Sequence, residues 1–246
     1  MIKNKYIIFA LASILITAGC YILHFSLKLN YPISNNTSSW AELGEFFGGI
    51  LGPILSFISI VLLIQSLKLQ NDTNESLQLE LNENKKTEKL KSFETLFFNM
   101  VNSQAASFKL LKIEFIENNE SKTAQGAGAV ALIEESVQQH REQGKTEQEI
   151  GELLNNIDDE DQIYSATRIY YVIVKTVSEK LSDTHGFSKE IRIDYFTMLI
   201  NFTDFPLLRL IMMSLQFMKN PQTDYLKNSP EFNEALKSVK LSYQLY

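Results

Sequence analysis

Histidine and acidic side chains are the residues of this chain that could bind a metal or transfer a proton. Its three histidines, His24, His140 and His185, stand far apart, and none has the spacing of a metal-binding motif such as HExxH. The acidic run from Asp158 to Asp161 could offer carboxylates to a divalent cation. Such runs more often begin a helix, where they face the positive end of its dipole. A hydrolase would need a convergent set of His, Ser and carboxylate residues that is not evident, so we predict no catalytic, cofactor-binding or metal site.

A more specific pattern is a row of small residues at four-residue steps, which places them along one face of a helix. These residues are Gly44, Gly48, Gly52 and Ser56. In lipid, small residues allow helices to approach closely, and close van der Waals contact favours their association. An earlier apolar stretch carries a matching face at steps of three and four, made of Ala10, Ser13, Thr17, Cys20 and His24. We predict that these two faces are helix-packing sites in a membrane.

Two interpretations of these faces remain open. The faces could close the two apolar helices of one chain on each other, or they could pack several copies into an oligomer. In an oligomer, a weakly polar lining would come from Ser56, Ser59 and Gln65, with His24 and Glu45 at the outer mouth. Pro53 would kink the second helix, and nearby serine hydroxyls could help to satisfy the carbonyl group that it frees.

These residues lie on two apolar stretches near the start of the chain. The first extends from Ile7 to Leu23 and the second from about Phe46 to Leu67, and neither contains Asp, Glu, Lys or Arg. A bilayer core of roughly 30 Å is crossed by about 20 mostly apolar helical residues. We therefore predict a transmembrane hairpin over residues 1–67, with spans at about 6–27 and 46–67. Residues 68–246 are predicted to form a cytoplasmic helical domain.

The flanking charges predict how the hairpin is oriented. Lys3 and Lys5 precede the first span and Lys68 follows the second, whereas the loop over residues 30–45 has no Lys or Arg. The positive-inside rule then places both termini in the cytoplasm and predicts a multi-pass protein of the bacterial inner membrane. Aromatic residues stand where interfacial belts are expected, namely Tyr6, Phe25, Tyr31, Trp40 and Phe46.

Two targeting signals compete with this interpretation of the first span. A basic start, an apolar stretch and small residues are also typical of a cleaved signal peptide. The residues Thr17 to Cys20 resemble a bacterial lipoprotein box, although Thr17 stands where a bulky apolar residue is usual. Apolar residues also continue after Cys20, where a polar tether would be expected, so we favour an uncleaved span.

Composition limits the partners of the predicted domain. The net charge is −6 and the pI is about 5.2, which excludes a general nucleic-acid-binding protein, although a local basic patch at Lys85 to Lys91 remains possible. The single cysteine, Cys20, leaves no partner for an internal disulfide. Direct contact with nucleic acid is therefore uncertain.

Apolar periodicity predicts that this domain is all-α. Apolar residues recur at steps of three and four, namely Leu90, Phe93, Phe97, Met100, Phe108, Leu111 and Phe115. Because no helix breaker intervenes, we predict one helix from Gln65 to Phe115, with a solvated stalk over residues 82–89. Gly126 and Gly128 predict a flexible loop, and residues 134–157 predict an exposed helix.

The remainder of the domain is predicted to be helical as well. Helices are expected over 163–183 and 189–201, with His185-Gly186 ending the first of them. Asp204 and Pro206 predict the start of a buried core helix that is too short to span a membrane, and Ser229-Pro230 the start of a last one. No sheet is needed.

Two sequence stretches resemble phage abortive-infection membrane proteins. They are WAELGEFFGGILGPILSF at residues 40–57, continued by LKLQ at 67–70, and FETLFFNM at residues 93–100. The likeness covers residues 40–104 well and 164–221 more loosely. In that family a two-helix hairpin precedes a helical cytoplasmic domain. The matching motifs are packing motifs, so they indicate a family rather than a mechanism.

The chain is also similar in size and layout to two-span membrane effectors encoded beside some bacterial retrons. That resemblance implies a toxin that a reverse transcriptase carrying an RNA–DNA hybrid holds inactive. When phage interference releases it, the toxin would oligomerise through its hairpin and permeabilise the inner membrane. Separately from the resemblance, the absence of a helix breaker between Gln65 and Phe115 suggests that this long helix couples the domain to the hairpin. The alternative is a membrane-anchored helical scaffold or sensor with no pore-forming activity.

Overall fold

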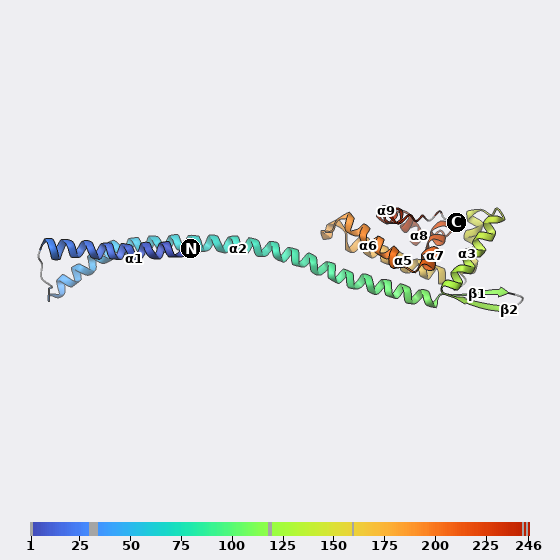
Figure 1. Cartoon of the computed structure of the whole chain (residues 1–246), viewed down its shortest axis with the longest axis horizontal. Coiled ribbons are helices and arrows are strands. Elements are labelled where there is room, and N and C mark those ends of the chain that lie inside the picture. The colour runs from blue at the N-terminus through green and yellow to red at the C-terminus, as the bar shows by residue number, and fades with distance from the viewer. Residues whose placement is uncertain (1, 30–33, 118–119, 159, 243, 245) are drawn as a thin grey trace. The chain divides into compact units, whose positions relative to one another are not determined.

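The computed structural model describes residues 2–29, 34–117, 120–158, 160–242, 244 and 246 (Figure 1). The described chain is nearly all helical, as predicted. It divides into two compact units, Met1–Glu83 and Asn84–Tyr246. Helix α2, Thr37–Leu110, contributes residues to both units.

The first unit contains the two predicted apolar helices. Helix α1, Ile2–Tyr21, passes into a π-helical segment, η1, Ile22–Lys28. By length and composition, Lys5–Lys28 and the apolar part of α2 can each cross a membrane, and only 6% of each apolar window is buried. Helix α2 begins at Thr37, before the predicted second span, which starts at about Phe46. The Asn36 side chain accepts a hydrogen bond from the Ser38 N–H at 3.1 Å and caps the first turn of the helix. Tyr31, of the predicted aromatic belt, lies outside the described residues.

The side chains in the middle of α2 are exposed. Every residue from 82 to 89 is exposed, which confirms the predicted solvated stalk. Apolar burial begins again further along, where Phe93 and Phe97 enter the core of the second unit.

The end of α2 corrects two predictions. The helix stops at Leu110, and an antiparallel β-hairpin follows, made of β1, Lys112–Glu117, and β2, Glu120–Gln125. Its register pairs Ile113 with Ala124. The helix prediction failed because Phe115 continues the three-and-four spacing of α2, although the sequence KIEFIE also alternates at the two-residue period of a strand. A small sheet is therefore present where we expected none.

The predicted loop and exposed helix are also corrected. Gly126 makes the turn after β2 at φ +52°, but Gly128 lies within α3, Ala127–Glu142. The predicted helix over 134–157 is two helices, because Gly144 breaks the chain at φ +76° and a Thr146 capping box starts α4, Glu147–Ile157. Each helix buries one face instead of lying exposed, with Ala129, Val130, Ile133 and Val137 from α3 and Ile150, Gly151 and Leu154 from α4.

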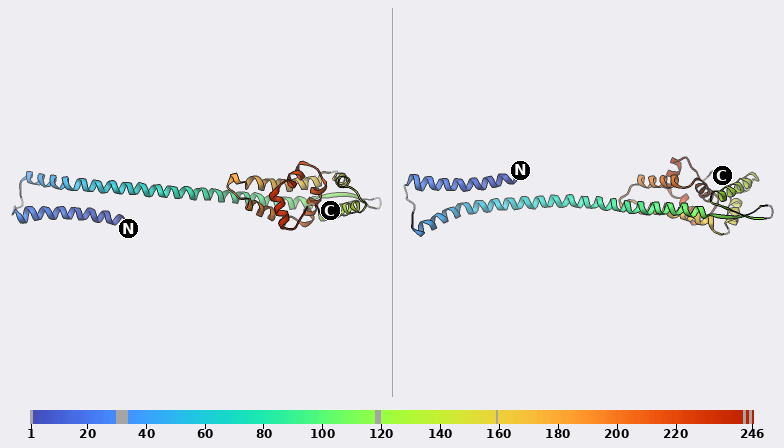
Figure 2. Two further views of the ribbon diagram at one scale, coloured as in Figure 1. Left: turned by 90° about the horizontal axis from the view of Figure 1, so that it is seen from above. Right: turned by 60° about the horizontal axis from the view of Figure 1, so that its bottom comes forward.

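The described part of the second unit contains five further helices, coloured from yellow to red in Figure 2. They are α5, Gln162–Lys180; α6, Lys189–Phe202; α7, Phe205–Phe217; α8, Pro221–Lys227; and α9, Pro230–Ser238, with a short 3₁₀ turn, η2, at Asp183–His185. Asp204 and a proline start α7, and most of that helix is buried, which confirms the predicted core helix. By length and composition α6 and α7 could form one span only as a pair bent by 115°.

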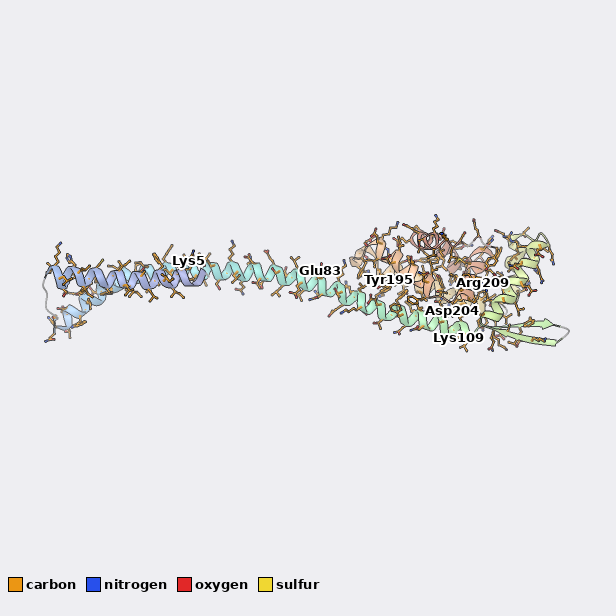
Figure 3. The ribbon with its side chains drawn as sticks, viewed as in Figure 1. Lys5, Glu83, Lys109, Tyr195, Asp204 and Arg209 are labelled. Carbon is orange, nitrogen blue, oxygen red and sulfur yellow. The ribbon has the colours of Figure 1, made fainter. Side chains whose placement is uncertain are left out.

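Aromatic packing joins α2 to this core. The ring of Tyr195 on α6 meets the rings of Phe93 and Phe97 at centroid distances of 5.0 and 5.3 Å. Tyr195, labelled in Figure 3, donates its hydroxyl hydrogen to Glu94 Oε1 at 2.9 Å. The last part of α2 is therefore built into the second unit.

Candidate functional site

The small-residue face of α2 is open along its length. At Gly44, Gly48 and Gly52, an added Cβ would meet no atom of the described chain within 4 Å beyond the local helix backbone. These positions therefore do not hold another helix of the same chain in close contact. The surface is left free for lipid or for another copy of the chain.

The matching face of α1 has its hydroxyl groups satisfied within the helix. Ser13 Oγ donates to the Phe9 carbonyl at 2.9 Å, and Thr17 Oγ1 donates to the Ser13 carbonyl at 2.8 Å. Thr17 is buried, one of two such residues in the first unit together with Ile58 among those described. The Ser13 and Thr17 side chains can thus lie against apolar surroundings without an unpaired polar group.

The predicted pore-lining residues do not gather in one place. His24 and Phe46 line one open hollow of about 500 Å³. Glu45 is the sequence neighbour of Phe46. Gln65 lies elsewhere, because its Nε2 donates to the hydroxyl of Tyr6 at 2.6 Å. The structure thus associates His24 with the start of the second apolar stretch and gives Gln65 a partner on α1.

Pro53 lies inside α2 and removes the N–H that would bond to the Gly49 carbonyl. The Ser59 hydroxyl donates instead to the carbonyl of Leu55, at 2.9 Å. The predicted rescue of the freed carbonyl by Ser59 is therefore not made.

Two contacts between α1 and α2 were not predicted. One is the bond between Tyr6 and Gln65, and the other is the ring of Tyr21 against Phe46 and Phe47 at centroid distances of 5.5 and 5.8 Å. The aromatic residues were visible in the sequence, but their partners depend on how the two helices are paired.

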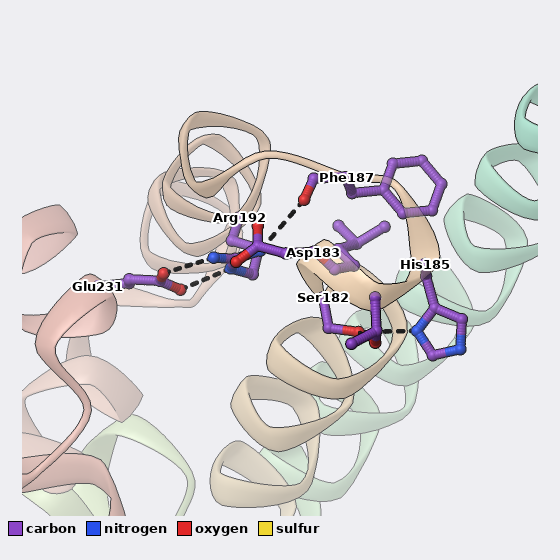
Figure 4. Close-up of polar contacts among 8 residues, drawn as sticks. Ser182, Asp183, His185, Phe187, Arg192 and Glu231 are labelled. Atoms are coloured by element: carbon purple, nitrogen blue, oxygen red, sulfur yellow. Dashed lines mark hydrogen bonds and ion pairs between the residues drawn. The ribbon is translucent and has the colours of Figure 1, made fainter.

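The main polar cluster of the second unit is centred on a buried arginine, Arg192 (Figure 4). Arg192 donates to both carboxylate oxygens of Glu231 at 2.7 Å, and to Asp183 Oδ1 at 3.0 Å. It also donates to the main-chain carbonyls of Leu181 and Phe187. Glu231 and Asp183 raise the pKa of Arg192 above its usual range, so it stays charged. The cluster holds η2, α6 and α9 together, so its role is structural.

Beside this cluster, among the described residues, one serine contacts one histidine, and the two lie only three residues apart in the sequence. Ser182 Oγ lies 2.7 Å from His185 Nδ1 and 2.8 Å from Thr184 Oγ1. An acyl-transfer triad needs a carboxylate on the other side of the imidazole. The neighbouring carboxylate of Asp183 pairs with Arg192 instead, so this geometry does not assemble a triad.

The acidic run before α5 works as a helix cap. The Asp158 carboxylate accepts the N–H groups of Ile163 and Tyr164 at 2.6 and 2.8 Å. The predicted helix start is confirmed, but Asp158 is buried rather than solvated, and burial raises its pKa despite the two donors. Asp159 lies outside the described residues. Among the residues searched, no three His, Cys, Asp or Glu side chains are placed to hold a metal ion.

A small cavity of about 230 Å³ lies in the second unit, where the end of α2 meets α5 and α7. Apolar side chains dominate its lining, including Phe108, Leu111, Ile169 and Leu207, and polar side chains come from Gln104, Ser107, Gln162 and Ser165. Its volume is below the roughly 300 Å³ at which small-molecule sites begin.

Comparisons of the chain with protein-family models, with curated proteins and with solved structures found no match.

Proposed function

We propose that this chain is a membrane effector of antiphage defence that acts by abortive infection. The observation that carries the proposal is a pair of apolar helices whose surfaces are almost wholly unburied within the chain. Such surfaces need lipid as their solvent. The resemblance of residues 40–57 and 93–100 to abortive-infection membrane proteins supplies the biological context.

In this proposal α1 and α2 form an antiparallel transmembrane hairpin. The Tyr6–Gln65 bond lies near the start of α1, and the contact of Tyr21 with Phe46 lies near its end, which supports antiparallel pairing. Lys5 and Lys68 flank the spans on the same side, which supports an inner-membrane protein with both termini in the cytoplasm.

Activity in this proposal comes from oligomerisation through the open glycine face. Within the described residues, no other helix covers this face at Gly48 and Gly52, which supports packing between copies rather than closure of a single hairpin. The bound partner would be a reverse transcriptase carrying an RNA–DNA hybrid, as the resemblance implies. Since the chain carries a net charge of −6, the protein partner is a better contact than the nucleic acid.

Membrane potential in bacteria that express the chain alone tests this proposal. A voltage-sensitive dye should report rapid depolarisation with the parent chain. Gly48→Leu and Gly52→Leu together should abolish it while insertion and expression persist, because leucine prevents the close approach of helices. Depolarisation that persists in the double variant would contradict packing through this face. A Gly19→Leu chain is the matched control, since its Cβ also meets nothing but lies off the predicted stripe.

The alternative is a membrane-anchored scaffold or sensor, and the second unit supports it by having its own buried core. Replacing residues 1–67 with an unrelated two-helix anchor separates the two functions. A scaffold would keep its protective activity after this exchange, whereas a membrane-permeabilising effector would lose it.

A further inference from the structure

Tyr246 is held against α3 and α7 by an unusually complete set of hydrogen bonds. The side-chain amide of Gln216 donates to the Tyr246 carbonyl at 2.7 Å and accepts from its N–H at 3.1 Å. Arg141 also donates to that carbonyl. The Tyr246 hydroxyl donates to Glu134 Oε1 at 2.8 Å, and Arg209 binds the other oxygen of Glu134.

These contacts recognise both the main chain and the side chain of Tyr246. A glutamine amide that pairs with the N–H and the carbonyl of the same residue recognises extended backbone, as a neighbouring strand would. The carboxylate of Glu134 is mostly buried, and Arg209 fixes its orientation. A phenol can satisfy it by donation, whereas a phenylalanine ring would leave it without that donor.

The protonation state of the phenol suits this role. Burial, together with the neighbouring Glu134 carboxylate, raises the pKa of Tyr246 above its usual range. The hydroxyl therefore keeps its proton and remains a donor throughout the neutral range.

α9 ends in a turn in which Lys240 adopts φ +59°, and Leu241 donates to the Leu236 carbonyl at 2.9 Å. Residues other than glycine rarely adopt this left-handed conformation, and here it ends the helix. Between the turn and Tyr246, the described residues Ser242 and Gln244 are exposed.

We propose that Glu134, Arg141, Arg209 and Gln216 form a docking site for a tyrosine in an extended segment, and that Tyr246 is its exchangeable occupant in cis. The partner that replaces it is a protein segment that presents a tyrosine with a free main-chain N–H. The hydrogen-bond complementarity of the four side chains specifies this occupant. The proposal does not depend on the membrane function proposed above.

Peptide binding to the full chain in detergent micelles tests the docking site. The probe is a fluorophore-labelled peptide of residues 239–246, VKLSYQLY, amidated so that it offers a neutral carbonyl. In the parent chain the tethered Tyr246 competes at a local concentration of the order of millimolar. The Tyr246→Ala chain should therefore bind the peptide at least tenfold more tightly, as measured by fluorescence anisotropy.

Two controls assign this binding to the site. A peptide carrying Tyr246→Phe should bind the vacated chain at least fivefold more weakly, although it retains Tyr243. Adding Gln216→Leu to the Tyr246→Ala chain should abolish binding. Equal affinity of the parent and vacated chains, or of the two peptides, would overturn the proposal.

A folding control keeps the experiment decisive. Cooperative thermal unfolding by circular dichroism shows whether the Tyr246→Ala chain is folded. If it is not, Tyr246→Phe replaces it: that chain loses only the hydroxyl bond to Glu134, so its tethered segment should compete more weakly than the parent's. A folded variant that binds the peptide no more tightly than the parent chain would overturn the proposal.

Discussion

Gly151 of α4 lies directly against the backbone of Phe217 in α7. A Cβ at position 151 would meet the Phe217 carbonyl oxygen at 2.5 Å, closer than van der Waals contact allows. Since the obstacle is main chain, one of the two helices must move to admit a side chain. The glycine therefore sets the distance between α4 and α7.

Gly151→Ala should destabilise the second unit by about 1–3 kcal/mol, the usual range for overpacking. Urea unfolding of the full chain in detergent, followed by circular dichroism, measures this loss. Gly128→Ala in α3 is the matched control, because a Cβ there meets nothing within 4 Å. It should stabilise the chain by about 0.5–1 kcal/mol through helix propensity. Equal effects at the two positions would contradict the close approach of α4 and α7.

Glu231→Gln should destabilise the chain by about 3–5 kcal/mol, because it removes the charge that balances a buried arginine. The Arg192 side chain is 8% exposed and that of Glu231 is 21% exposed. Asp183→Asn is the control: Asp183 contacts the same arginine but is 78% exposed, so its loss should cost about 1 kcal/mol or less. Denaturation midpoints compare the two variants, and the reverse order would refute the assignment of Glu231 as the main counter-charge.

Tyr170→Phe should stabilise the chain by about 1 kcal/mol, in contrast to most core substitutions. The Tyr170 side chain is fully buried, and its hydroxyl has no hydrogen-bond partner among the described residues. Removing that oxygen leaves the ring packing against Phe232 in place. Tyr195→Phe is the contrasting variant and should destabilise the chain, because it breaks the bond to Glu94. Thermal unfolding of both variants checks this difference in sign.

The chain should lose stability in alkaline solution. Burial raises the pKa of Tyr170, and burial with a neighbouring carboxylate raises those of Tyr195 and Tyr246. The folded state thus holds these protons more tightly than the unfolded state, whose tyrosines titrate near pH 10. Their stabilising contribution is complete below about pH 10 and declines as the pH rises above it.

Unfolding free energies measured between pH 8 and 11 should show this decline. The slope should be shallower in Tyr195→Phe, which removes one of the three groups. An identical slope in the parent and the variant would mean that Tyr195 does not contribute.

Helix α2 should transmit the state of the second unit to the membrane, since it is continuous from Thr37 to Leu110. Seven Gly-Ser residues inserted after Asn84 should abolish partner-controlled depolarisation, because a flexible segment passes on neither rotation nor displacement. A seven-residue helical insertion keeps the helix nearly in phase, at 3.6 residues per turn, and should preserve control. Dye fluorescence in cells that also express the partner reports the result, and intact control in both insertions would exclude this coupling.

Much of the helical fold could be predicted because its determinants are local. Asp204 with Pro206, and Ser229 with Pro230, start helices by backbone rules that need no distant partner. The β-hairpin after Leu110 was missed because Phe115 satisfies both a helical and a strand period. Which period prevails is decided by tertiary contacts, such as the burial of Ile113, and these are not written in the local pattern.

The candidate sites also differ in how far the sequence alone could predict them. The glycine face of α2 follows from spacing alone, and so it could be found in the sequence. Arg192 and Glu231 are separated by 39 residues, and Tyr6 and Gln65 by 59, so their pairing depends on how helices meet. A lone arginine among apolar residues of α6 was the signal that could have indicated a buried ion pair.

The pairing of Glu134 with Tyr246 spans 112 residues, so it cannot form until residue 246 has been added during synthesis. The apolar helices leave the ribosome long before residue 246 has been added. At translation rates of about 5–20 residues per second, roughly 10–35 s separate the completion of residue 67 from that of residue 246. Delivery of the apolar helices to the lipid bilayer can therefore be finished while the second unit is still an incomplete nascent chain. Chaperones that shield Phe93 and Phe97 during this interval would protect a surface that the mature protein no longer exposes.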